Sequence, residues 1–352
     1  MNHILDRLSG KPRPATGADQ SSGAKAAVSP GPNLKRIAGK AALTIISTVF
    51  TVSILLGADL YLHHKHGINL WGYRGPSVGK KQPGEKRIAV LGGSTAWGYG
   101  LTAPQSFPGQ LQQRFAERVR SEGKPPINVL NLASNNEGAY SFQYTLSDYD
   151  YLDCDAVLIY SGYNDLWNEN RFISRHRSPV FMWTGYLPLV SILTEDKIAA
   201  WKSRLAGEDK PVFTPPDPNQ LAKTREQLSR LPGQLPDAGR SNDTTQGTCP
   251  VEFSFYCQQI YQVTNAALSR GKRVLVVTEP YLSERHIEQQ RALEGMLTKR
   301  FAGQAKLRYV NLGGLIDLRD GSLCWDGMHL TEEGNRRIAE ALTQPVLELL
   351  GP

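Results

Sequence analysis

Consecutive apolar residues recur in short runs from residue 87 onward, and each run is followed by glycine or small polar residues. Such runs are typical of strands that are buried on both faces of a parallel sheet. Apolar residues three or four positions apart lie between the runs and predict covering helices. The pattern therefore predicts an α/β fold whose strands occupy residues 87–91, 127–132, 154–160, 273–278 and 307–312.

Helices are predicted where apolar positions fall on one face. Ser106 can cap a helix that has Pro108 in its first turn. Leu111, Phe115 and Val119 lie on one side of that helix. The same spacing predicts helices over about 251–270 and 284–301, and a last helix with an apolar stripe of Ile338, Leu342, Val346 and Leu350.

The amino-terminal region has a different composition. Residues 1–36 are rich in Gly, Pro, Ser and Ala, which is typical of disorder. An uncharged apolar stretch from Ala41 to Ala58 follows, and its length is about the minimum that crosses a bilayer. We therefore predict a disordered, basic cytoplasmic tail over residues 1–36, a transmembrane anchor over 37–62 and a spacer over 63–86.

Charge limits the partners and orients the anchor. The formal net charge is +7, but residues 1–40 hold seven lysines and arginines against two aspartates and so carry +5 of it. The rest of the chain offers no polyanion-binding surface, so no nucleic acid partner is expected. Positive residues stay on the cytoplasmic side, which predicts an extracytoplasmic domain, in the periplasm of a bacterium. The long tail argues against a cleavable signal peptide, and the flanking charges argue against a buried soluble helix.

Residues 166–250 interrupt the alternation of strands and helices. An aromatic and apolar stretch at 181–189 is followed by charged residues and then by Pro, Gly and Ser. Segments of this length are usually lids or loose linkers, and the apolar part could cover the site or contact the membrane. Among the cysteines we predict at most a Cys249–Cys257 disulfide, and only if Cys249 lies outside the helix that contains Cys257.

Ser94 lies on a glycine turn after the first predicted strand. A hydroxyl at the carboxyl end of a parallel strand faces the crevice where α/β sheets bind ligands, so Ser94 is a candidate nucleophile. Three glycine-loop motifs are excluded: the dinucleotide fingerprint is absent, a phosphate loop would need Lys and Ser/Thr at Tyr99-Gly100, and Ala96 replaces the second glycine of the nucleophile elbow.

Polar residues that follow the next two strands can converge on Ser94. Gly138 lies in the loop after the second strand and Asn164 follows the third. Because the carboxyl ends of parallel strands share one edge of the sheet, a backbone amide near Gly138 and the side-chain amide of Asn164 can serve as donors to an oxyanion. A helix cap is the structural alternative for Asn164.

One histidine has the setting of a catalytic base. His329 follows Asp326 by three residues, so one turn lets the carboxylate accept a hydrogen bond from the imidazole and hold its tautomer. The alternative is a loop pair that caps the last helix. His176 lies inside the insertion, and His286 is expected on a solvated helix face.

Four segments together resemble the SGNH hydrolases, also called the GDSL family of esterases and lipases. The first block matches at Gly92-Gly93-Ser94-Thr95, except that Gly93 stands where the family has Asp. The third block is matched by Gly162-Tyr163-Asn164-Asp165, and the last block by Asp326-Gly-Met-His329. The glycine of the second block falls on Gly138, with Asn136 as a rival.

The resemblance implies a three-layer αβα sandwich with a parallel five-stranded sheet, and an activity that needs no cofactor and no metal. It also implies ester hydrolysis through an acyl-serine intermediate. Ser94 would attack the ester, His329 would accept its proton, and Asp326 would orient His329. The backbone amides of Ser94 and Gly138, together with Asn164, would hold the oxyanion.

The leading hypothesis is a membrane-anchored serine esterase. Its substrate would carry acetyl or other short acyl groups on a cell-envelope or exported glycan, or on a lipid ester. One alternative is an O-acyltransferase that uses the same residues, favoured if a lid excludes water. Another is a non-catalytic carbohydrate-binding or assembly protein.

Overall fold

The computed structural model describes residues 34–205, 218–235 and 249–351. Five strands form one parallel sheet in the order β2-β1-β3-β4-β5. This arrangement confirms the predicted α/β fold. The strands are β1 (Lys86–Gly92), β2 (Ile127–Asn131), β3 (Ala156–Ser161), β4 (Arg273–Thr278) and β5 (Leu307–Val310).

Helices surround the sheet and also form the amino-terminal extension. They follow the predicted apolar spacing, and Ser106 caps α3 by accepting a hydrogen bond from the Gly109 amide. The α-helices of the described residues are α1 (Leu34–His66), α2 (Ser94–Trp97), α3 (Phe107–Glu122), α4 (Ala139–Asp148), α5 (Pro179–Thr184), α6 (Leu189–Leu205), α7 (Pro218–Ser229), α8 (Ser254–Ser269), α9 (Glu284–Arg300) and α10 (Glu332–Leu350).

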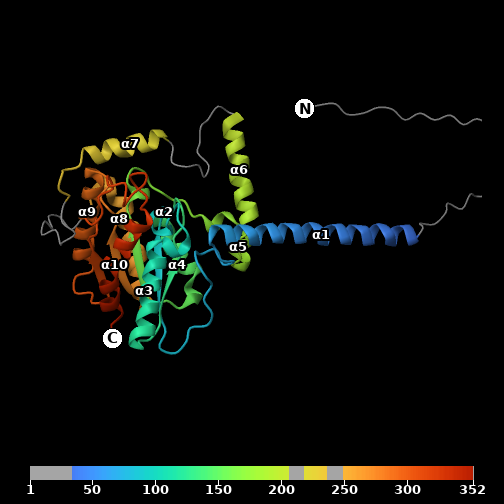
Figure 1. Ribbon diagram of the computed structural model, residues 1–352, viewed down its shortest axis with the longest axis horizontal. Helices are drawn as coiled ribbons and strands as arrows, with labels where there is room; N and C mark the ends of the chain where they lie inside the picture. Colours follow the sequence, from blue (N-terminus) through green and yellow to red (C-terminus); the bar gives the residue numbers. More distant parts are fainter. Residues whose placement is uncertain (1–33, 206–217, 236–248, 352) are drawn as a thin grey trace, which may run out of the picture. The chain divides into compact units, whose positions relative to one another are not determined.

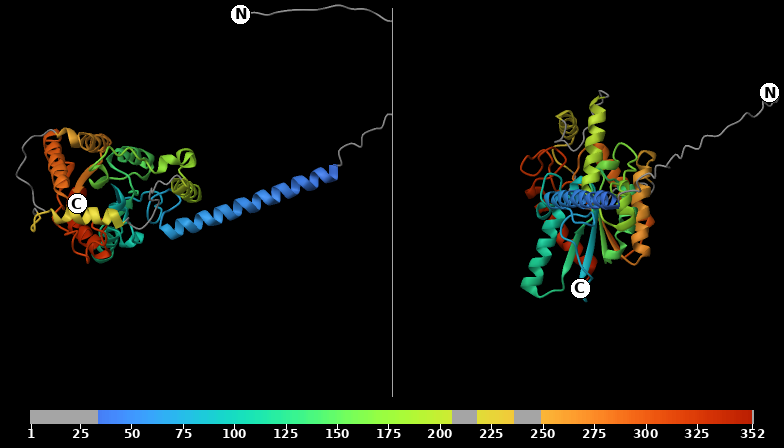
Figure 2. Two further views of the ribbon diagram at one scale, coloured as in Figure 1. Left: turned by 90° about the horizontal axis from the view of Figure 1, so that it is seen from above. Right: turned by 90° about the vertical axis from the view of Figure 1, so that its right-hand side faces the viewer.

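The sheet is covered on both faces, so the domain has three layers (Figures 1 and 2). A hydrophobic core lies on each face of the sheet. Successive side chains of β1 enter the two cores in turn, because neighbouring residues of a strand point to opposite faces. Ile88 and Val90 belong to the core under α3 and α10, whereas Ala89 and Leu91 belong to the core under α4, α8 and α9. The three-layer αβα sandwich is thereby confirmed.

Strand β3 begins two residues later than the apolar run predicts. Asp153 adopts a left-handed conformation with φ of 49°, and the Arg87 amide donates to Asp155 Oδ2 at 2.8 Å. A side-chain acceptor therefore replaces the backbone at this point, and regular pairing starts at Ala156.

Helix α1 has the length and composition of a membrane span over Ile37–His66. The chain divides into two compact units, Met1–Ser53 and Ile54–Pro352. Residues 1–33 of the predicted tail lie outside the described residues. A single amino-terminal helix of this kind is consistent with one membrane crossing, and its orientation remains a prediction.

Residues of the predicted spacer contact the domain. Tyr73 and Arg74 are buried, and the Arg74 amide donates to Asn131 O at 3.0 Å, at the end of β2. Within the predicted insertion, α5, α6 and α7 are helical, while residues 206–217 and 236–248 lie outside the described part of the chain.

The predicted disulfide is present. Cys249 and Cys257 are bonded, with their Cα atoms 6.4 Å apart. Cys249 precedes α8, which begins at Ser254, so the condition set by helix geometry is met. Cys154 and Cys324 are free and buried.

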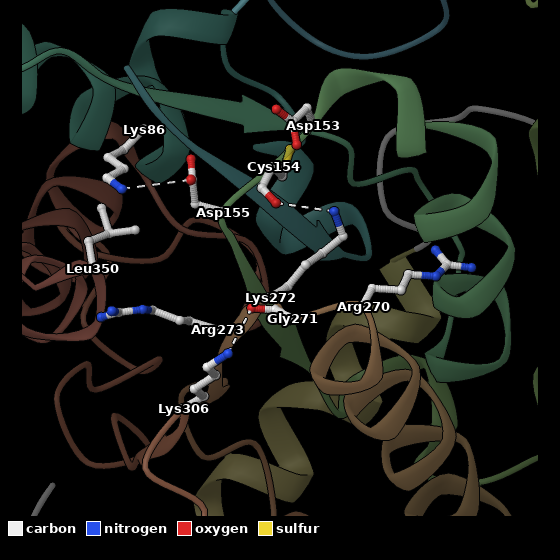
Figure 3. Close-up of a pocket in the computed structure, with 10 residues that line it drawn as sticks. All are labelled: Lys86, Asp153, Cys154, Asp155, Arg270, Gly271, Lys272, Arg273, Lys306 and Leu350. Atoms are coloured by element: carbon white, nitrogen blue, oxygen red, sulfur yellow. Dashed lines mark hydrogen bonds and ion pairs between the residues drawn. The ribbon is translucent and has the colours of Figure 1, made fainter. Parts of the chain in front are cut away.

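A basic hollow of about 350 Å³ lies at the amino ends of the strands. Figure 3 shows the charged side chains around it. Lys86 lies 3.9 Å from Asp155 and Lys272 donates to Cys154 O at 3.1 Å. These contacts are internal to the domain, and the hollow is at the edge of the sheet opposite to the carboxyl ends.

Candidate active site

Ser94 lies where β1 ends and the short helix α2 begins. The turn requires glycine before it, because a Cβ on Gly92 would lie 2.5 Å from both Tyr160 O and the Ala96 Cβ. Gly93 precedes α2 in an extended conformation. Ser94 is partly exposed, so its hydroxyl is accessible at the carboxyl edge of the sheet.

The structure brings His329 and Asp326 to Ser94. His329 Nε2 lies 2.9 Å from Ser94 Oγ, and His329 Nδ1 lies 2.6 Å from Asp326 Oδ2. An antiparallel β-bridge between the backbones of Cys324 and Leu330 closes the loop that carries Asp326 and His329. The hydroxyl of Ser94, the imidazole of His329 and the carboxylate of Asp326 therefore form one hydrogen-bonded chain. This arrangement can activate a serine.

Asp326 is held as an acceptor. Its Oδ1 accepts from the amides of Met328 at 2.9 Å and His329 at 2.6 Å. Burial alone would raise the pKa of Asp326, but the hydrogen bonds from the His329 ring and the two amides outweigh it and lower the pKa below the ordinary value. The carboxylate is thus charged at neutral pH and able to fix the imidazole.

Asn164 and the loop after β2 meet beside the turn that carries Ser94. Asn164 Nδ2 donates to Glu137 O at 2.8 Å, which places the Glu137–Gly138 peptide next to Asn164. Gly138 is buried and precedes α4. The rival Asn136 is exposed and left-handed, with φ of 63°. Gly138 and Asn164 therefore share the carboxyl edge with Ser94.

Gly93, which stands where the family pattern has Asp, lies close to Asn164. A Cβ at Gly93 would lie 2.3 Å from Asn164 Nδ2 and 3.1 Å from Glu137 O. The Asn164 side chain thus occupies the space that a side chain at this position would need. A side chain at this position would therefore have to displace the end of Asn164, whereas the backbone conformation, with φ of −89°, would accept any residue.

A buried carboxylate that the sequence analysis did not identify joins two of the loops. Glu279 follows β4 and is buried. The Thr95 hydroxyl donates to its Oε1, and the Tyr163 amide donates to its Oε2 at 2.8 Å. Thr95 is next to Ser94 and Tyr163 is next to Asn164, so the Glu279 side chain links the turn that carries Ser94 to the turn that carries Asn164.

Asp165 supports the loop of the second block in a similar way. The Ala139 amide donates to Asp165 Oδ2 at 2.8 Å. A Cβ on Gly138 would lie 2.5 Å from Asp165 Oδ1, so glycine is required for close approach. Burial raises the pKa of Asp165 to about 7. The last residue of the Gly-x-Asn-Asp block is therefore a structural partner of Gly138.

Arg74 braces the chain that follows Ser94. Its guanidinium donates to Gly98 O at 2.9 Å and also to the carbonyls of Trp97 and Leu101. The same group lies 4.8 Å from the centre of the Trp97 ring. Burial lowers the pKa of Arg74 to about 10. The predicted spacer thus supplies a side chain that holds the residues that follow Ser94.

Aromatic rings flank the imidazole. The centroid of the Tyr99 ring lies 4.7 Å from that of His329, and the Trp325 ring stacks at 5.7 Å. Helix α7 lies close to the loop that carries Asp326 and His329. Thr224 of α7 packs so near to Gly327 that a Cβ on this glycine would lie 2.7 Å from Thr224 Cγ2. Part of the predicted insertion therefore contacts the loop that carries Asp326 and His329.

The prediction for His286 is wrong. Its side chain is fully buried rather than solvated, and its ring lies edge-on to Tyr163 at 4.9 Å. A Cβ on Gly162 would lie 2.6 Å from His286 Nε2. Burial lowers the pKa of His286 to about 3, so it is a neutral support beneath the third block. His176, within the predicted insertion, forms a hydrogen bond between its Nε2 and Asp148 Oδ2, which are 2.8 Å apart.

No curated protein sequence matches the chain. Solved structures to which this chain is similar include a family 3 carbohydrate esterase from Clostridium thermocellum, at 14% identity and a TM-score of 0.41, covering 76% of this chain and 97% of that one. Another is a catalytic mutant of an acetylxylan esterase from Geobacillus stearothermophilus, at 11% identity and a TM-score of 0.42, covering 76% of this chain and 94% of that one.

A lipase/acylhydrolase from Enterococcus faecalis is similar at 13% identity and a TM-score of 0.39, covering 74% of this chain and 95% of that one. The family model described as GDSL-like Lipase/Acylhydrolase matches residues 88–342, which is more than half of the chain. That range includes the serine turn, the Gly-x-Asn-Asp block and the Asp-x-x-His loop. The chain therefore belongs to the GDSL-like lipase/acylhydrolase family of serine ester hydrolases.

Proposed function

We propose that Ser94, His329 and Asp326 form the catalytic triad of a membrane-anchored esterase. The observation that carries the proposal is the hydrogen-bonded chain from Ser94 Oγ through the His329 ring to Asp326. A serine hydroxyl is a weak nucleophile until a base removes its proton, and the base needs a partner that fixes its tautomer. Asp326 is the buried, charged partner that this role requires.

Hydrolysis then proceeds in two halves. Ser94 Oγ attacks the acyl carbon while its proton passes to His329 Nε2, and the tetrahedral intermediate collapses with loss of the alcohol, which takes the proton from His329. A water molecule next gives a proton to His329 and attacks the acyl-serine. Release of the carboxylic acid returns the proton to Ser94.

The oxyanion of each tetrahedral intermediate needs fixed donors. We assign this role to the backbone amides of Ser94 and Gly138 and to the side chain of Asn164. Support comes from the contact of Asn164 with the Glu137–Gly138 peptide and from its close approach to Gly93. The link through Glu279 holds the turns of Ser94 and Asn164 together, which keeps the donors in place before the charge develops.

The substrate we propose is a glycan or lipid-like ester that carries acetyl or other short acyl groups at the cell envelope. The apolar helix α1, with basic residues at its amino end, supports a domain held outside the cytoplasm at a bacterial inner membrane. The partly exposed Trp325 ring beside His329 offers a flat aromatic surface, which suits a sugar ring at the mouth of the site.

The test is ester hydrolysis by the full-length protein in detergent. With a short-chain aryl ester, Ser94→Ala should lower kcat/KM by about 10³-fold or more, whereas Ser121→Ala, an exposed serine on α3, should not. Parental activity of the Ser94→Ala variant would end the proposal. Product analysis with an added sugar acceptor separates hydrolysis from acyl transfer. A hydrolase still releases free acid when the acceptor is present, whereas a transferase moves the acyl group to the sugar.

A further inference from the structure

We infer that a surface around α5 lies in the interface of the membrane that α1 crosses, and that lipid is its occupant. The inference rests on the anchor in the proposed function. The surface, called here the aromatic surface, consists of Trp71, Tyr151, Met182 and Trp183. These residues come from three separate parts of the chain and line one hollow of about 570 Å³ together with Phe181, Thr184, Gly185 and Asp148.

The aromatic surface is unusually exposed for its composition. Trp183 is 89% exposed, Tyr151 61%, Met182 52% and Trp71 43%. Large contiguous apolar patches on a soluble domain mark contact sites for proteins or membranes. Trp and Tyr are the residues enriched at membrane interfaces, where a ring can have its apolar body in lipid and its polar edge in water. The composition therefore favours a lipid interface as the partner.

The sequence brings this surface to the end of the membrane helix. Helix α1 ends at His66, and Trp71 follows five residues later. A chain of five residues spans at most about 18 Å, so Trp71 cannot be far from the last turn of α1. Trp71, which lines the same hollow as the other three residues, thus follows closely on the helix that carries the apolar, exposed side chains of Ile54, Leu55 and Leu60.

Contacts to Asp59 connect the surface to the residue that follows the apolar stretch of α1. Asp59 ends the uncharged stretch and so marks the expected boundary of the hydrocarbon region. Its Oδ1 accepts from the Val190 amide at 2.7 Å, and the Tyr186 hydroxyl donates to its Oδ2. Tyr186 follows α5 by two residues. Helix α5 is therefore tied to the residue that marks the membrane boundary.

The surface is also held in shape. Leu187 N donates to Leu70 O at 3.0 Å, and the Tyr149 hydroxyl donates to Trp71 O at 2.6 Å. The Trp71 ring lies over Gly185, where a Cβ would be 3.7 Å away from it. These bonds join the segment after α1 to Leu187, which follows α5, and to Tyr149, which follows α4. The exposed rings therefore form a fixed apolar face that can enter the headgroup region without refolding.

The experiment measures the environment of Trp183 in the full-length chain reconstituted in phosphatidylcholine vesicles. The fluorescence of Trp183 is obtained by subtracting the spectrum of Trp183→Phe from that of the parent. Lipids with bromine on the upper part of the acyl chain should reduce this component by about two-fold or more, and aqueous iodide should have little effect. Trp167, which is 58% exposed and contacts Arg285, serves as the control through Trp167→Phe, and its component should respond to iodide alone.

Each other outcome overturns the inference. Quenching of the Trp183 component by iodide, with no effect of brominated lipid, places the surface in water. Protection from both reagents places it against protein, such as a second copy of the chain. Release of the chain from the vesicles by alkaline carbonate overturns the inference together with the anchor, whereas a retained chain with iodide-quenched Trp183 overturns the inference alone. Hydrolysis of a soluble aryl ester should be unchanged in Trp183→Phe.

Discussion

Replacement of Glu279 by glutamine should make the protein more stable at alkaline pH. Glu279 accepts hydrogen bonds from the Thr95 hydroxyl and from the Tyr163 amide. A glutamine can keep both contacts, because its oxygen can accept from the amide while its NH₂ group donates to Thr95 Oγ1. The substitution therefore removes the charge and retains the geometry.

The size of the gain follows from the pKa of Glu279. Burial raises it from 4.5 to about 7, and the two hydrogen bonds only partly oppose this. An acid whose pKa is raised in the folded state has a charge penalty that is absent below the unfolded pKa, grows between about 4.5 and 7, and is complete above that range. At 1.36 kcal/mol per pKa unit, the penalty is about 3 kcal/mol at pH 8 and below about 1 kcal/mol at pH 5.

The assay is denaturant unfolding of parent and Glu279→Gln at pH 5 and pH 8. The free energy of unfolding of the variant, relative to the parent, should rise by about 2 to 3 kcal/mol between the two conditions. Glu340→Gln is the control, since Arg114 lowers the pKa of that exposed carboxylate and its removal gives no gain at pH 8. A Glu279→Gln variant whose stability relative to the parent is the same at both pH values would refute the reasoning.

Three other predictions test separate parts of the site. Gly93→Ala should lower kcat by about 10- to 100-fold in an aryl ester assay, because the new methyl group displaces the Asn164 amide; unchanged kcat would mean that Asn164 is not a donor. Asp326→Asn should lower kcat by about 10³- to 10⁴-fold, because its oxygen keeps the contacts to the two backbone amides and its NH₂ group then faces His329 Nδ1 and fixes the wrong tautomer, with the fold checked by circular dichroism. Replacing Cys249 and Cys257 by serine should lower the free energy of unfolding by about 2 to 3 kcal/mol, the value for a loop of this length. Equal stability of parent and double variant in the absence of reductant would contradict this expectation.

The strands were predictable because both of their faces are buried. Continuous apolar runs such as 273–278 are typical of buried parallel strands when they alternate with helical patterns, and β4 occupies those residues in the structure. The ends were harder to predict where a side chain replaces a backbone partner, as Asp155 does before β3. The five strands and their common edge thus followed from the hydrophobic pattern alone.

The approach of Ser94, Asp326 and His329 was predictable because each residue follows a recognisable local signal. The glycine turn after the first strand indicates the serine, and the three-residue spacing lets a carboxylate reach an imidazole within one turn. The structure gives the distances that the pattern lacks, 2.9 and 2.6 Å. The chemical roles of these residues stay predictions until variants are assayed.

The polar supports beneath the site were not predictable. Glu279 follows a strand as any loop carboxylate could, and only the fold shows that it contacts Thr95 and Tyr163. His286 misled because charged and polar neighbours on its helix suggested a solvated face, yet Gln289 and Gln290 are buried with it. Polar residues are usually exposed, but those under these loops are buried and hydrogen-bonded, so their polarity predicts the wrong exposure.

The predicted spacer concealed a structural role as well. Gly, Pro and Lys between residues 67 and 86 suggest a linker, but Arg74 donates to three carbonyls after Ser94. A single buried arginine in such a segment is a weak signal in sequence because its partners are turns that form only in the folded chain. Fragments made for biochemical work should therefore retain Tyr73 and Arg74.

The central claim is that Ser94 is the nucleophile activated by His329. The most direct measurement is covalent labelling of the full-length protein with an aryl phosphonate, followed by peptide mass spectrometry. The account predicts one adduct on Ser94, at least about 10²-fold slower labelling in His329→Gln, and no adduct in Ser94→Ala. An adduct on another residue, or equally rapid labelling of Ser94 without the imidazole, would contradict it.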